Sequence, residues 1–407
     1  MLLLRRAGDP APFEEALVHA CLHNQAYDPQ CEHDRSAYLA RLILETGDRT
    51  RLFTRLASRI DDPDVDVALL FDVIARLAAE GGEAEAAAVR RAYADLPDEG
   101  RLDAMEAMVR LDGLPALLRC AERLEQDLDE DGWRGKHLLD ALKTRGKPDI
   151  DRALSAARAE HPSLERLMAH LEAPDAPTLY ADWPRDFPTV RAELRRGIGP
   201  RGALYKVLSD DEWRLICEDF RSQTQVGLAR PYLRLFARRR FIGGPAELVG
   251  WMNGSDSRAS WSATLALGWI ASPLVREMAL QQLRAGKPRG ARLLQANYRP
   301  GDFDLLLPML RDAPSDEVAH DLSLAVLDLI GENNPPIDES LDILVALYEH
   351  TPCSMCRGDA VSHLVKAGQT PTWIAEECRF DADPNTAGLF AAPGCSPLGE
   401  LSARSDD

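Results

Sequence analysis

Residues 259–283 read ASWSATLALGWIASPLVREMALQQL, and this stretch decides the fold. In its first half, 259–270, small and apolar residues recur three and four positions apart. In its second half, one helical face carries Val275, Met278, Ala279 and Leu283. Such spacings predict two amphipathic helices. Because one helix pair cannot bury its apolar face alone, we expect further pairs to stack against this one.

The same spacing recurs along much of the chain. Apolar residues share one helical face in the sets Leu52, Phe53, Leu56 and Ile60; Val67, Leu70, Phe71, Ile74 and Leu77; and Leu322, Ala325, Val326, Leu329 and Ile330. Glycines at 81–82 and 113 mark breaks between such segments. Sustained alternation of polar with β-branched residues, the strand pattern, is hard to find. The sequence therefore predicts an all-α protein.

Two segments carry a family resemblance, 262–268 (SATLALG) and 357–364 (RGDAVSHL). Both resemble the first helix of a HEAT repeat, most clearly within about 227–383 and more loosely within 34–124. Gly331 and Gly368 are 37 positions apart at what we interpret as matching helix ends, near the period of about 40–47 residues in HEAT and armadillo units. The resemblance implies a right-handed α-solenoid of antiparallel helix pairs, whose extended surface usually binds other proteins.

Prolines divide the chain. The stretch 173–224 departs from the repeat pattern and contains Pro174, Pro177, Pro184, Pro188 and Pro200. We expect an N-terminal helical repeat array over 1–172, a connecting or inserted segment over 173–224, and a C-terminal HEAT-like array over 225–390. The end, 391–407, is polar and rich in Ser, Pro and Gly, so we expect it to be a mobile tail.

Composition restricts the function classes. The chain of 407 residues has a formal charge of -18, which argues against uniform coating of DNA, because such binding neutralises phosphates with Lys and Arg. No apolar run approaches the roughly 20 residues that span a bilayer, and the start lacks a secretory signal pattern. Eight cysteines are too sparse for a disulfide scaffold, so we expect reduced thiols and a cytoplasmic protein.

One segment reverses the acidic balance. Residues 185–240 hold 13 Lys and Arg against 7 Asp and Glu, a net of +6, which leaves -24 for the remainder. The candidate ligand-binding arginines are Arg191, Arg195, Arg196, Arg230, Arg234 and Arg238. The last three are four positions apart, and such a row suits phosphate or carboxylate groups. The alternatives are a solvated face or internal pairing with acidic residues.

Two tryptophans share a helical face. Trp261 and Trp269 are eight positions apart in one expected helix. They could stack on a planar ligand, so we include them among the candidate binding residues. The alternative is that they pack between repeats, which is the more frequent role of aromatic residues at helical spacing.

Cysteines and histidines form two groups in the sequence. Cys353, Cys356, His363 and Cys378 suggest a Cys3His zinc site, because a C-x-x-C precedes a histidine that shares a helical face with Cys356. A second hypothesis concerns Cys21, His23, Cys31 and His33, whose C-x-H spacing is unusual for zinc. The alternative for both groups is that cysteines fill small core positions, with no cofactor.

Enzyme motifs are mostly missing from the sequence. It contains no G-x-x-x-x-G-K-[ST], no H-E-x-x-H and no G-x-S-x-G. We therefore interpret the chain as a non-enzymatic scaffold or adaptor for a protein partner. The alternative is a HEAT-like protein that binds a phosphorylated group or nucleic acid through 185–240, as a lyase- or glycosylase-like enzyme. The sequence indicates no membrane contact and no particular oligomeric state.

Overall fold

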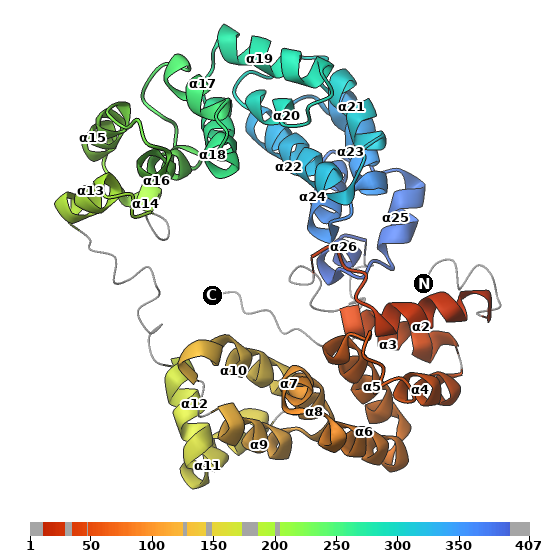
Figure 1. Ribbon diagram of the computed structural model, residues 1–407. Coiled ribbons are helices and arrows are strands. Elements are labelled where there is room, and N and C mark those ends of the chain that lie inside the picture. Colours follow the sequence, from red (N-terminus) through yellow and green to blue (C-terminus); the bar gives the residue numbers. More distant parts are fainter. Residues whose placement is uncertain are drawn as a thin grey trace. The chain divides into compact units, whose positions relative to one another are not determined.

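The computed structural model describes residues 11–28, 35–46, 48–124, 128–143, 149–172, 186–199 and 204–390. Within these ranges the ordered elements are all helices and no strand occurs, which confirms the all-α prediction (Figure 1). The chain divides into two compact units, here called unit 1 (Met1–Ala176 with Pro371–Asp407) and unit 2 (Pro177–Thr370). Residues 371–390, which we assigned to the second array, thus group with unit 1. The expected tail, 391–407, lies outside the described residues.

Unit 1 is built around the helix α5. Its elements are η1 (Ala11–Phe13), α2 (Glu14–Leu22), α3 (Arg35–Thr46), α4 (Arg49–Ala57), α5 (Val67–Gly81), α6 (Glu83–Asp95), α7 (Asp98–Asp103), α8 (Met105–Asp112), α9 (Leu114–Leu124), α10 (Leu128–Lys143), α11 (Ile150–Glu160), α12 (Pro162–Glu172), α25 (Thr372–Cys378) and α26 (Pro384–Gly388). Helix α5 contacts α2, α3, α4, α6 and α8, and contacts then continue from α8 to α10 and from α10 to α12.

The apolar face of α5 is buried, as its spacing predicts. Leu70, Phe71, Ile74 and Leu77 are fully enclosed. Asp66 begins the helix, and its side chain accepts a hydrogen bond from the backbone N–H of Leu69 at 2.9 Å. This cap satisfies one of the donors that a helix start leaves unpaired.

Unit 2 contains the region in which the repeat pattern is clearest. Its helices are α13 (Phe187–Arg195), α14 (Leu204–Val207), α15 (Asp210–Arg221), α16 (Val226–Phe236), α17 (Ala246–Met252), α18 (Ser257–Gly268), α19 (Pro273–Arg284), α20 (Gly290–Leu293), α21 (Phe303–Arg311), α22 (Asp316–Asn333), α23 (Ile337–His350) and α24 (Ser354–Lys366). The described part of 173–224 forms α13, α14 and α15. Since α13 and α15 both contact α16, this part belongs to the helix packing of unit 2.

Contacts in unit 2 follow a regular order. One series runs from α16 to α18, α20, α22 and α24, and a second runs from α19 to α21 and α23. Sequence neighbours join the two series, as α19 contacts α20 and α23 contacts α24. Helices within one series are thus next but one along the chain, and pairs of sequence neighbours connect the two series. The right-handed solenoid of antiparallel pairs stays a prediction, and this order of contacts is compatible with it.

Two glycines have opposite surroundings. Gly268 ends α18 and lies so close to α20 that a Cβ there would be 2.4 Å from the carbonyl oxygen of Arg292. Only a residue without a side chain permits this approach. Gly331 is exposed, with no atom within 4 Å of such a Cβ. It also lies inside α22, which continues to Asn333, so the sequence placed this helix end two residues early.

Candidate functional site

The basic segment is anchored by one buried carboxylate, that of Asp219 on α15. Arg191 donates to it from Nε and Nη2 at 2.6 and 2.8 Å, and Arg195 donates at 3.0 and 2.7 Å. Burial acts to raise the pKa of Asp219, but the hydrogen bonds from the two guanidinium groups outweigh it and hold that pKa below its usual range. These two predicted ligand-binding arginines therefore link α13 to α15.

Other arginines of the segment are also paired within the chain. Arg230 donates to Asp256 at 2.6 Å, and Arg239 donates to Asp210 at 2.7 Å. Arg196 directly follows α13, and its Nη2 lies 3.9 Å from Oε1 of Glu193, three positions earlier. Internal pairing with acidic residues, the alternative left open by the sequence, thus accounts for these side chains.

Two arginines of the predicted row differ from the rest. Arg234, in the last turn of α16, and Arg238, just after it, are exposed, and neither forms an ion pair in the described part of the chain. A Cβ at Gly199 would lie 3.5 Å from Nη1 of Arg234, so this guanidinium reaches the loop that follows α13. The row is therefore divided into the neutralised Arg230 and two cations that face solvent.

The apolar surroundings of this region come from two adjoining segments. Gly197 approaches Gly227 so closely that a Cβ on the former would be 3.1 Å from the carbonyl oxygen of the latter. Ile198 directly follows Gly197, and Val226 directly precedes Gly227. These side chains are 45% and 38% exposed. Ile198 thus lies next to Gly199, which the Arg234 guanidinium reaches, whereas Val226 lies at the start of α16, the end opposite to Arg234 and Arg238.

The two candidate tryptophans have packing roles. Nε1 of Trp269 donates to the carbonyl oxygen of Ala237 at 3.3 Å, which joins the end of α18 to the end of α16. The ring centroid of Trp261 lies 5.4 Å from the guanidinium carbon of Arg289 and 5.8 Å from that of Arg292. Both indoles are half-buried. Sequence reasoning missed Arg289, because it lies 28 positions from Trp261 and outside the basic segment.

The C-x-x-C is grouped with a histidine that the sequence did not single out. Ligand atoms of Cys353, Cys356 and His320 all lie within 4.8 Å of one another. Burial, together with the neighbouring Cys353 sulfur, raises the pKa of the Cys356 thiol to about 12. His363 and Cys378 are not part of this group. His363 follows Cys356 by seven positions, and seven residues of α-helix rise about 10.5 Å, which is too far for one metal ion.

The N-terminal hypothesis is only partly covered by the structure. Cys21 is buried on α2, where burial raises the pKa of its thiol to about 12. The His23 ring lies beside the His19 ring, tilted by 46° to it, with centroids 4.4 Å apart. Cys31 and His33 lie outside the described residues. The position of Cys21 fits the core-packing alternative.

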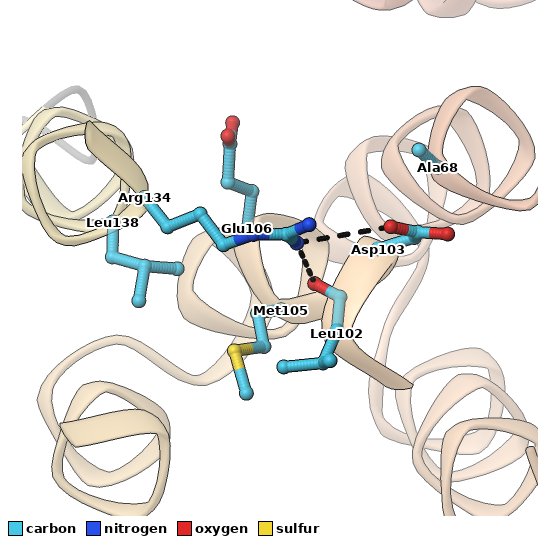
Figure 2. Close-up of a pocket in the computed structure, with 7 residues that line it drawn as sticks. All are labelled: Ala68, Leu102, Asp103, Met105, Glu106, Arg134 and Leu138. Atoms are coloured by element: carbon cyan, nitrogen blue, oxygen red, sulfur yellow. Dashed lines mark hydrogen bonds and ion pairs between the residues drawn. The ribbon is translucent and has the colours of Figure 1, made fainter. Parts of the chain in front are cut away.

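A small opening lies in unit 1, about 170 Å³ in volume. Its lining consists of Ala68, Leu102, Asp103, Met105, Glu106, Arg134 and Leu138. Figure 2 shows Arg134 extended towards Asp103 and Leu102, and it donates to the Leu102 carbonyl oxygen at 3.3 Å. Ligand pockets for drug-sized molecules measure about 300–1,000 Å³. The opening is smaller than that and its cation is used internally, so we assign it no ligand.

Comparisons with known proteins gave no match to a family model, to a curated protein or to a solved structure. The resemblance to HEAT repeats therefore stays a prediction. None of the described helices has the length and apolar character required to cross a bilayer.

Proposed function

We propose that this chain is a non-enzymatic scaffold that holds an acidic protein segment at one end of unit 2, against Arg234 and Arg238. The observation that carries the proposal is the difference between these two arginines and their neighbours. Arg191 and Arg195 share the carboxylate of Asp219, and Arg230 pairs with Asp256, whereas Arg234 and Arg238 remain exposed and unpaired in the described part.

The chemistry of the surface indicates the class of partner. Two unneutralised guanidinium groups favour carboxylates, which they bind through paired N–H donors. Ile198 adds exposed apolar area next to Gly199, the loop residue that the Arg234 guanidinium reaches. A segment that carries both acidic and apolar residues satisfies both features. Charge complementarity of this kind sets association rate and specificity more than affinity, so we expect binding that weakens with salt.

The order of helix contacts supports a scaffold. Stacked helix pairs expose a continuous surface, because each pair buries its apolar face only against its neighbours. The series from α16 to α24 has this order. We infer that unit 2 is a right-handed α-solenoid and that its partner lies along this surface from α16 onward.

The test is affinity capture with charge-reversed variants of the full chain. The variant Arg234→Glu/Arg238→Glu is compared with Arg284→Glu/Arg311→Glu. Arg284 and Arg311 are a matched control, because they are exposed, lie at helix C-termini and form no ion pair in the described part of unit 2. Captured proteins are quantified by mass spectrometry at low and high salt.

We expect an acidic protein that the wild type and the control capture equally and that the first variant loses. Capture by the wild type should fall as salt rises. An unchanged set of captured proteins in Arg234→Glu/Arg238→Glu would exclude these arginines as binding determinants. Equal loss in both variants would assign the effect to net charge rather than to this site.

A further inference from the structure

The histidine and the two cysteines come from neighbouring helices of unit 2. Cys353 is the residue before α24, Cys356 lies in its first turn, and His320 lies on α22. Because α22 and α24 contact each other, a residue 33 positions before Cys353 reaches the C-x-x-C. The three side chains therefore converge from two elements that the fold holds together.

The separations suit one metal ion after small side-chain adjustments. Zinc binds thiolate sulfur at about 2.3 Å and imidazole nitrogen at about 2.0 Å, so tetrahedral ligand atoms lie roughly 3.5–3.8 Å apart. In this structure the three ligand atoms lie within 4.8 Å of one another. The difference of about 1 Å is within the range of a side-chain torsion adjustment, without a movement of the helices.

Two neighbouring groups favour thiolate ligands, and they act against the burial that raises the pKa of the Cys356 thiol to about 12, so zinc must displace a proton as it binds. Cys353 and Cys356 are 4% and 2% exposed, whereas His320 is half-buried and so leaves a path to solvent. The Thr351 hydroxyl accepts from the backbone N–H of Cys353 at 3.4 Å and donates to the Cys356 sulfur. The N-terminus of α24 adds a positive field at both sulfurs. Hydrogen bonds to ligand sulfurs are a recurrent feature of protein metal sites.

We propose that His320, Cys353 and Cys356 bind one zinc ion, with water as the fourth ligand. Two thiolates and one imidazole form a set that favours Zn²⁺ over Mg²⁺ or Ca²⁺, which prefer oxygen. The ion joins α22 to α24 and so fixes the end of the contact series in unit 2. The presence of His320 distinguishes this group from two cysteines that only fill core space, because such packing requires no imidazole beside the sulfurs.

The test uses the reduced, metal-free full chain titrated with Co²⁺ and then with Zn²⁺. We expect one Co²⁺ per chain, with the visible bands of tetrahedral cobalt and a sulfur-to-cobalt charge-transfer band, and displacement by one equivalent of Zn²⁺. Zinc should also protect Cys353 and Cys356 from alkylation in the wild-type protein, a readout that needs no variant.

Variants locate the ligands. His320→Gln, at a half-buried position, should weaken zinc binding by more than about 100-fold, since loss of even a supporting group costs roughly 10–100-fold. His363→Gln and Cys378→Ser are the controls and should bind zinc as the wild type does. The melting temperature of each metal-free variant shows whether it is folded, and zinc should raise that temperature in the wild type but not in His320→Gln.

Two results of the titration would overturn the proposal: less than about 0.1 zinc per chain, since zinc held by thiolates is tightly bound, or an octahedral cobalt spectrum. Two results from the variants would do the same: unchanged binding in a folded His320→Gln variant, or loss of binding in the His363→Gln or Cys378→Ser control. A Cys353–Cys356 disulfide that forms equally fast with and without zinc would also contradict it, because a bound ion protects both sulfurs.

Discussion

The same substitution at two glycines should have opposite effects on stability. In Gly268→Ala the added methyl group would lie 2.4 Å from the carbonyl oxygen of Arg292, whereas ordinary contacts begin at 3.4 Å. The added methyl group therefore requires α18 and α20 to move apart by about 1 Å. Overpacking of this kind costs about 1–3 kcal/mol. The better helix propensity of alanine offsets up to about 1 kcal/mol of it, so we expect a net loss of roughly 1–2 kcal/mol.

Gly331→Ala is the matched control. This position is helical and exposed, with no atom within 4 Å of an added Cβ, so the propensity gain of about 0.5–1 kcal/mol should appear alone. Urea denaturation followed by circular dichroism measures both changes. Hydrogen exchange of peptides from α18 and α20 localises the Gly268→Ala effect. Equal stabilisation by both substitutions would refute the close packing of α18 on α20.

Three further predictions concern α15. Asp219→Asn should lower the free energy of unfolding by about 3 kcal/mol, since it leaves the partly buried Arg191 without its charged partner. The control Asp211→Asn, at an exposed ion pair, should lower it by less than about 1 kcal/mol. Urea denaturation measures both changes. The pKa of Asp219 is lowered in the folded state. Its contribution to the stability of the fold is therefore fully present above about pH 4 and disappears as pH falls through the folded-state pKa. The stability difference between wild type and Asp219→Asn should therefore shrink below pH 4, and a difference that grows instead would contradict the assigned shift. Ser209→Ala should cost about 0.5–2 kcal/mol, because Ser209 and Glu212 form a capping box at the start of α15, and Ser222→Ala, after the end of that helix, provides the comparison.

Helix positions could be predicted because they depend on local sequence. The apolar spacing of Leu322, Val326 and Leu329 is enough to predict that these side chains are buried on one face of α22, and they are. The end of that helix was less predictable, since α22 continues two residues past Gly331 to Asn333. Helix ends depend on capping and tertiary contacts rather than on periodicity.

The candidate sites depend on contacts between helices, which spacing along the chain does not reveal. The pairing of Arg191 with Asp219 joins residues 28 positions apart, and both are charged residues on amphipathic helices. His320 and Cys353 approach each other only because α22 packs on α24. Reasoning from one helical face selected His363, which is displaced along the helix axis from Cys356. The sequence therefore predicted a C-x-x-C group and a basic segment, but it did not reveal His320 beside the two cysteines or Asp219 beside Arg191 and Arg195.

Site-specific photo-crosslinking tests the central claim, that Arg238 lies in a protein-binding surface. A photoreactive amino acid replaces Ala237, next to Arg238, in one preparation and Asp312, next to Arg311, in another, so that the arginines themselves are kept. Both preparations are irradiated in native lysate. We expect a crosslink from position 237 to one protein, through a peptide rich in acidic and apolar residues, with no such product from position 312. The same products from both positions, or none from position 237, would contradict the claim.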